Sequence, residues 1–83
     1  MGTGHTMDSA MEILNRPFRT LMDREGLSDV HLIKADGYFY IYADGEHERS
    51  LTTKQTTSIY LNSFNQQSAR QWVEDIKNII NKP

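Results

Sequence analysis

The chain has 83 residues, of which 37% are hydrophobic and 24% charged. This length supports one hydrophobic core but not two. The absence of cysteine excludes disulfides, thiolate zinc sites, iron–sulfur clusters and thiol nucleophiles. Nine Lys and Arg against eleven Asp and Glu give a net charge of −2, and these charges are interspersed. Such a pattern does not favour electrostatic binding to a nucleic-acid backbone or to an anionic membrane.

The chain contains no apolar run long enough to span a membrane and no signal-peptide pattern. We therefore expect a cytoplasmic protein without a membrane partner. Residues 1–6 show no hydrophobic period and are interpreted as a disordered cloning remnant, which leaves residues 7–83 as a single α+β domain.

The first predicted helix covers residues 17–25, with Asn15 or Arg16 at its N-cap. Pro17 suits a first helical turn, and apolar residues follow at helical spacing. Gly26 is placed to be a left-handed C-cap, with Leu27 folding back on the last turn. Residues 11–15 are expected to add a further turn before this helix.

Residues 30–35 and 38–43 are β-prone runs separated by Asp36-Gly37. Asp-Gly is preferred in two-residue type I′ hairpin turns, whose central residues both need positive φ. This turn sets Leu32 opposite Ile41, and opposed residues share a face of the sheet. One predicted face carries Val30, Leu32, Phe39, Ile41 and Ala43. The other predicted face carries His31, Ile33, Ala35, Tyr38, Tyr40 and Tyr42.

Residues 44–56 are polar apart from Leu51, and we expect a loop. A tight hairpin at Asp44-Gly45 would place Glu48 opposite Ile41 on the apolar face, which argues against it. A third strand is expected over residues 57–62, with Ile59 and Leu61 toward the core and Tyr60 pointing the other way.

The last predicted helix starts with a capping box, in which Ser68 is the N-cap and Gln71 reaches back to its amide. Its apolar stripe consists of Trp72, Val73, Ile76, Ile79 and Ile80. The predicted fold is therefore an α+β two-layer sandwich in the order α-β-β-β-α. It has a three-stranded, mainly antiparallel sheet with both helices on one face.

Three segments carry a resemblance to known sequences: residues 37–42 (GYFYIY), residues 58–65 (SIYLNSFN) and residues 71–76 (QWVEDI). In these segments the chain resembles a group of small uncharacterised bacterial and phage-associated proteins, which share GYFY, S-[IV]-Y-[VL]-N and QWVE patterns. The resemblance covers most of residues 27–80. It implies the fold and an origin in a phage or mobile element, and it implies no particular activity.

The four tyrosines all fall on one predicted face, which His31 and Ile33 share. Tyrosine is a good strand former that tolerates a half-wet sheet surface. With both helices on the opposite side, however, these rings and Ile33 would form a contiguous apolar patch that monomers rarely expose, and tyrosine is enriched at interface cores. We therefore predict a non-enzymatic interaction module that forms a homodimer or docks a protein partner through six residues: Tyr38, Tyr40, Tyr42, Tyr60, His31 and Ile33.

The alternative function is binding of single-stranded nucleic acid by base stacking on the tyrosines. Nucleic acid is the less favoured partner, because the hairpin supplies only Lys34 as a cation, and on the other face. The element order also matches the double-stranded RNA-binding domain. The affinity of that domain depends on a cluster of lysines at the start of its last helix, where this chain has Gln67, Ser68, Ala69 and Arg70. We therefore reject that function and keep the topology as an analogy.

The sequence favours no enzyme, catalytic residue, cofactor or metal. It has no Gly-rich phosphate loop and no serine elbow. His31 beside Tyr42 could carry a proton, but a general base needs a pocket and a partner. The oxygen and imidazole donors Asp44, Glu46, His47 and Glu48 lack calcium-loop spacing, and polar loops of this kind are usually solvated.

Overall fold

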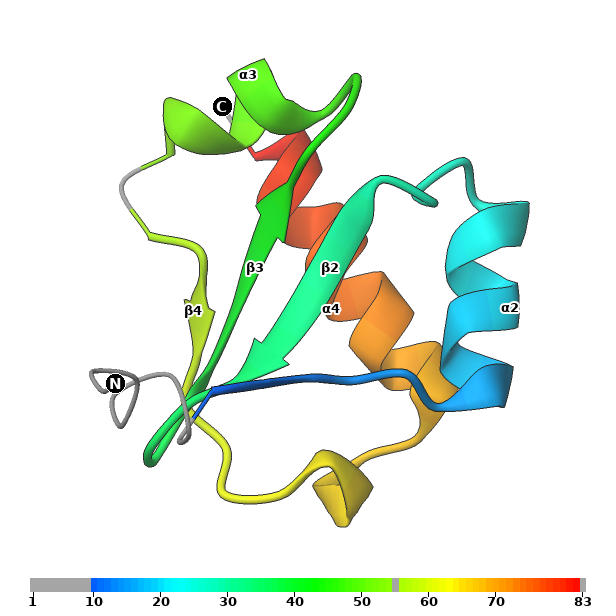
Figure 1. Ribbon diagram of the computed structural model, residues 1–83, viewed down its shortest axis with the longest axis vertical. Coiled ribbons are helices and arrows are strands. Elements are labelled where there is room, and N and C mark those ends of the chain that lie inside the picture. Colours follow the sequence, from blue (N-terminus) through cyan, green and yellow to red (C-terminus); the bar gives the residue numbers. More distant parts are fainter. Residues whose placement is uncertain (1–9, 55, 83) are drawn as a thin grey trace, which may run out of the picture.

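Alternating apolar residues build an antiparallel sheet in the middle of the chain (Figure 1). The computed structural model describes residues 10–54 and 56–82, so the expectations for residues 1–6 and for the start of the domain at residue 7 lie outside the described residues. The strands are β1 (Met11–Glu12), β2 (Val30–Lys34), β3 (Phe39–Ala43) and β4 (Ser58–Ile59), and they are ordered β1-β2-β3-β4. Each neighbouring pair is antiparallel.

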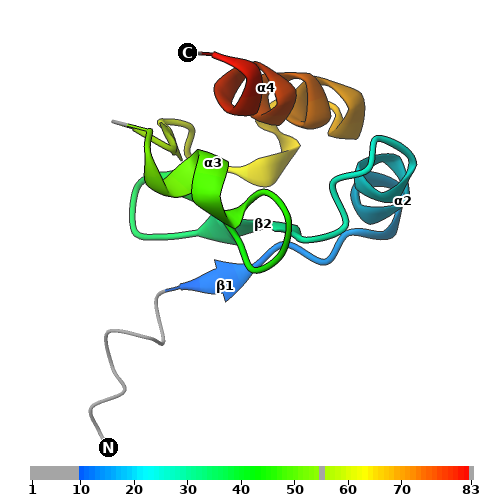
Figure 2. The same ribbon diagram turned by 90° about the horizontal axis from the view of Figure 1, so that it is seen from above.

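Two of the three described α-helices cover one face of this sheet. The helices are α2 (Arg16–Arg24), α3 (Glu48–Thr52) and α4 (Ala69–Asn81), and a short 3-10 helix, η1 (Phe64–Gln66), precedes α4. Figure 2 shows α2 and α4 together on one side of the sheet. The α+β class and the placement of both predicted helices on one face are confirmed, whereas the predicted count of three strands is wrong.

The additional strand is β1, in the segment where we expected an extra helical turn. Met11 and Glu12 pair with Lys34 and Ile33 of β2 instead. The helix cannot extend back into this segment because the Asn15 side chain caps it, accepting a hydrogen bond from the Phe18 amide at 3.0 Å. The predicted helix is otherwise confirmed to within one residue at each end.

The predicted C-terminal cap of α2 is confirmed. Gly26 has a φ of 75°, and the Leu27 amide donates to the Met22 carbonyl at 2.8 Å while the Gly26 amide donates to Asp23 at 3.1 Å. This pair of bonds is a Schellman motif, which satisfies the last carbonyls of the helix and turns the chain toward β2.

The predicted hairpin register is confirmed at every paired position of β2 and β3, from Val30 opposite Ala43 to Lys34 opposite Phe39. The predicted type I′ turn is wrong, however. Gly37 has a φ of 86°, and Asp36 does not have positive φ. A left-handed residue at only the second central position is the pattern of a type II turn, and a type I′ turn requires it at both positions.

The core lies between the sheet and the helices. Its largest fully buried side chains are Trp72, Phe18, Phe39, Met22, Leu32, Ile76 and Val30. Ile59 and Leu61 are half-buried and pack against this cluster, although β4 itself is shorter than the predicted strand over residues 57–62. The predicted inward-facing residues are therefore confirmed.

Only one of the two hydrogen bonds of the predicted capping box is present at the start of α4. Ser68 accepts from the Gln71 amide at 3.1 Å as predicted, but the Gln71 side chain donates to Asp75 at 3.0 Å. The reciprocal box lies at η1, where Ser63 is the N-cap and the Gln66 side chain accepts from its amide at 2.8 Å. Both motifs have the same sequence spacing, so spacing alone did not distinguish them.

Candidate functional site: the tyrosine face

The side of the sheet opposite α2 and α4 carries the four tyrosines, and we call Tyr38, Tyr40, Tyr42 and Tyr60 the tyrosine face. The centroid of the Tyr38 ring lies 6.3 Å from that of the Tyr40 ring and 6.0 Å from that of the Tyr60 ring. The ring of Tyr42 lies 5.0 Å from that of His31. The sheet thus brings the predicted tyrosines and His31 onto one surface.

The members of this surface are not equally available to a partner. Tyr60 and Tyr42 are 77% and 43% exposed, whereas Tyr38, Tyr40 and His31 are half-buried. Ile33 is only 7% exposed, so it offers a partner almost no surface. Ile33 therefore contributes almost no accessible area to the predicted interaction surface, and among the predicted residues Tyr42 and Tyr60 are the most accessible.

Two carboxylates that were not predicted as site residues border the tyrosine face. Nδ1 of His31 lies 2.7 Å from an oxygen of Glu12, and its Nε2 lies 3.1 Å from an oxygen of Asp44. Glu12 comes from β1 and Asp44 follows β3, so the sheet pairing brings them to His31. The structure also assigns the polar segment around Asp44 to a compact turn that leads into α3, where we predicted only a loop.

These neighbours shift two pKa values. Burial lowers the pKa of His31, but its hydrogen bonds to Glu12 and Asp44 outweigh burial and hold the pKa above 6.5. Burial raises the pKa of the Tyr42 hydroxyl, and the charges of Glu12 and Asp44 raise it further. The Tyr42 ring therefore stays neutral over the whole physiological range.

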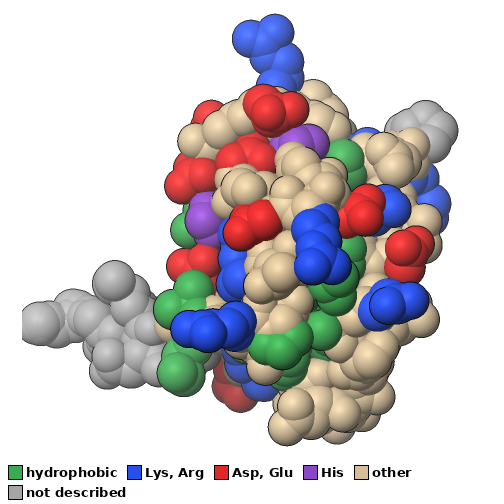
Figure 3. Space-filling model, turned by 90° about the vertical axis from the view of Figure 1, so that its right-hand side faces the viewer, with side chains coloured by type: hydrophobic (Ala, Val, Ile, Leu, Met, Phe, Trp, Pro, Cys, Tyr) green, Lys and Arg blue, Asp and Glu red, His purple; other side chains and the backbone are tan. Residues whose placement is uncertain are grey.

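Glu12 and Asp44 make the His31 end of the tyrosine face acidic. Figure 3 shows the two described histidines lying among acidic side chains. Lys34 pairs with Phe39 across the hairpin, which places it on the opposite face, and its ammonium lies 5.5 Å from the centroid of the Phe39 ring. The cation that the hairpin supplies is therefore directed away from the tyrosines.

The donors considered for a metal do not converge. His47 turns to Asp29, with its Nδ1 at 2.8 Å from one carboxylate oxygen and its amide donating to the other at 2.8 Å. Through the described parts of the chain, no three His, Asp or Glu residues are grouped in a way that could hold a metal ion. His47 and Asp29 instead fasten the turn that precedes α3.

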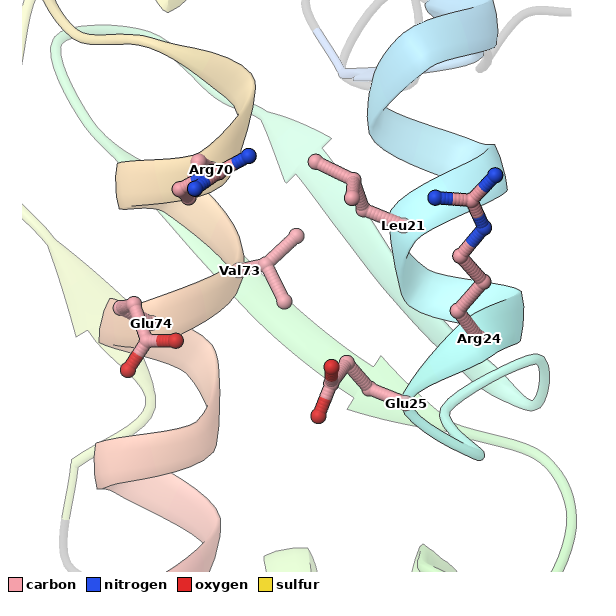
Figure 4. Close-up of a pocket in the computed structure, with 6 residues that line it drawn as sticks. All are labelled: Leu21, Arg24, Glu25, Arg70, Val73 and Glu74. Carbon is pink, nitrogen blue, oxygen red and sulfur yellow. The ribbon is translucent and has the colours of Figure 1, made fainter.

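A separate groove of about 260 Å³ lies between α2 and α4 (Figure 4). Leu21 and Val73 form its apolar floor, and four charged side chains border it: Arg24, Glu25, Arg70 and Glu74. Lys77 bridges the two acidic groups, at 2.9 Å from Glu25 and 3.7 Å from Glu74. The groove has charges of both signs on its rim, and most of its charged side chains are exposed.

Searches of family models, curated proteins and solved structures return no match to this chain. The resemblance to small phage-associated proteins and the assignment to a mobile element thus stay predictions. In the part of the chain that the structure describes, none of the helices has the length and apolar character needed to cross a membrane.

Proposed function

We propose that this protein is a non-enzymatic interaction module that pairs with a second copy of itself through the tyrosine face. The observation that carries the proposal is the position of the exposed rings. Tyr42 and Tyr60 present large aromatic surface, and the strand register puts them on the face opposite the core residues. Figure 2 shows that α2 and α4 lie on the other side of the sheet. Tyrosine suits such a surface because its ring contributes buried area while its hydroxyl still hydrogen-bonds.

The distribution of polar groups favours a second copy as the partner. Tyr38 and Tyr60 form one end of the face, which we call the hydroxyl end, and the carboxylates of Glu12 and Asp44 meet at His31 near the other end. A two-fold axis across the strands would place the hydroxyl end of each copy over the carboxylate end of the other. Hydroxyl donors would then meet carboxylate acceptors twice, which makes the face self-complementary in the way that an isologous interface requires.

The pairing predicts that removal of the two most exposed rings abolishes association. In Tyr42→Ser/Tyr60→Ser each substitution should cost about 2 kcal/mol of association free energy, or about 30-fold in Kd, because tyrosines buried in an interface are typical hot spots. Sedimentation equilibrium from low micromolar to several hundred micromolar chain should show a dimer for the wild type and a monomer for the double variant.

Met11→Ser is the matched control. Met11 is 66% exposed but pairs with Lys34, so it lies on the other face of the sheet, and its variant should dimerise like the wild type. A wild-type chain that remains monomeric at several hundred micromolar contradicts self-association. So does a double variant that dimerises with unchanged affinity.

The second candidate function, base stacking of single-stranded nucleic acid, has the contiguous rings of Tyr38, Tyr40 and Tyr60 in its favour. The acidic end of the face opposes it, because a phosphate backbone crossing the rings would approach Glu12 and Asp44. Titration of short oligonucleotides at several salt concentrations separates the two functions. Binding with a steep negative salt slope would favour nucleic acid, whereas no binding together with self-association favours the protein interface.

A further inference from the structure

We propose that Glu12, His31 and Asp44 form a protonation-controlled clamp that holds β1 on the edge of β2. This inference does not depend on the proposed dimer, because the clamp lies within one chain. Its basis is the geometry of a single imidazole with a carboxylate oxygen at each ring nitrogen, at 2.7 Å and 3.1 Å.

Both contacts can be hydrogen bonds only when the imidazole is protonated. A carboxylate can only accept, and a neutral imidazole has one N–H donor and one lone pair. Loss of the proton therefore leaves either Glu12 or Asp44 facing a lone pair at hydrogen-bond distance. The imidazolium, in contrast, donates to both, and these charge-assisted bonds connect β1 to the end of β3 through β2.

The remaining attachment of β1 is slight, so the clamp matters for its position. β1 pairs with β2 over only two residues, and one further bond runs from the Ile13 amide to the Leu32 carbonyl at 2.8 Å. Ile13 is half-buried against the core, but Met11 and Leu14 on either side are 66% and 70% exposed. Little apolar surface thus holds this strand in place.

The charges of the groups around His31 suit a clamp that depends on protonation. Glu12 faces it from β1 and Asp44 from the end of β3, while the tilted ring of Tyr42 of β3 lies 5.0 Å from its own ring. Tyr42 stays neutral because its pKa is raised above 10.0. Between neutral and mildly acidic pH, therefore, the charge that changes within this cluster is that of His31.

The direction of the pH effect follows from linkage. The pKa of His31 is raised in the folded chain, so its stabilisation of the β1 attachment is complete below the unfolded value of about 6.5 and is lost as the pH rises through the folded value. Above that pH β1 is held less tightly, and β2 becomes available as a sheet edge.

The test is the hydrogen-exchange protection factor of the Ile13 amide, followed by NMR from about pH 6 to about pH 8.5, which brackets a raised histidine pKa. Protection factors already correct for the pH dependence of intrinsic exchange. In the wild type we expect the Ile13 protection to fall about two- to five-fold across this range, as for a partly exposed ion pair. In His31→Gln it should not change with pH.

His47→Gln is the control for the other described histidine, because His47 pairs with the Asp29 carboxylate and Glu12 and Asp44 pair with His31, and it should keep the wild-type pH dependence. The His31 ring resonances give an independent readout, since the pKa of His31 should fall in both Glu12→Gln and Asp44→Asn. Equal results at two chain concentrations assign the effect to the clamp rather than to dimerisation. A wild-type Ile13 protection that does not vary with pH, or a His31 pKa unmoved in both variants, overturns the proposal.

Discussion

Trp72→Ala is expected to unfold the domain at room temperature. Trp72 is fully buried, its ring stacks on Phe64 at 5.5 Å, and it lies 4.6 Å from the Phe39 ring. Large-to-small substitution of a buried aromatic costs about 3–5 kcal/mol. A core of this size rarely supplies more than about 3–5 kcal/mol of net stability, so the loss matches the whole stability of the fold.

The loss should be visible as a missing cooperative transition in thermal melts followed by circular dichroism. Trp72→Phe separates the two contributions of the side chain. It retains a ring in the core but removes the Nε1–H that donates to the Phe64 carbonyl at 2.7 Å, so it should remain folded with a lowered Tm. Met11→Ala, at a largely exposed position outside the tyrosine face, should melt close to the wild type. A cooperatively folded Trp72→Ala would show that the core does not depend on this side chain.

The hairpin at the centre of the fold could be predicted because its determinants are local. Asp36-Gly37 and the alternation on either side act within fourteen residues, and the register follows once the turn is placed. The same information did not fix the turn type. A positive φ at Gly37 alone gives the same pairing as positive φ at both turn residues.

The strand β1 could not be predicted in the same way. Two paired residues show no recognisable period, and Met11 and Leu14 are apolar without being buried. The partner that places Glu12 is His31, 19 residues further along the chain. A contact of this range is set by the sheet, because Glu12 pairs opposite Ile33 and so reaches the same face as His31.

At the candidate site, too, local features could be predicted from the sequence and long-range contacts could not. The four tyrosines could be assigned to one face from alternation and register alone, and the structure confirms that arrangement. The burial of Ile33 and the carboxylates beside His31 depend on how the sheet is flanked. The sequence therefore predicted the aromatic character of the surface but neither its acidic end nor which members are accessible.

The turn before α3 illustrates a further limit. Residues 44–56 looked like a solvated loop because Leu51 is their one apolar side chain. In the fold Leu51 is buried, and the Asp29 carboxylate fixes His47 at the start of the short helix. Asp29 also accepts a backbone bond from Asp44 at 3.1 Å, so a residue from the preceding segment organises a turn whose own sequence does not predict it.

Gly45→Ala is therefore expected to destabilise the fold although Gly45 is exposed. A Cβ at this position would lie 2.7 Å from the Cβ of Asp29. This distance is shorter than any ordinary contact between two non-bonded carbon atoms. Asp29 cannot simply turn away, because its two oxygens bind the amide and the Nδ1 of His47. Overpacking of this kind costs about 1–3 kcal/mol, and each kcal/mol lowers the Tm of a domain this small by about 4–8 °C.

Thermal melts of Gly45→Ala and Gly37→Ala distinguish a steric clash from backbone strain. A Cβ at Gly37 meets open space but requires an unfavourable φ of 86°, which costs about 1–2 kcal/mol for an L residue. Combining each variant with Asp29→Gly then isolates the contact, since that background removes the Cβ on which an alanine at position 45 would clash. Gly45→Ala should lose most of its effect there, whereas Gly37→Ala should keep its own. If Gly45→Ala lowers the Tm equally in both backgrounds, close packing against Asp29 is not the reason that this position is glycine.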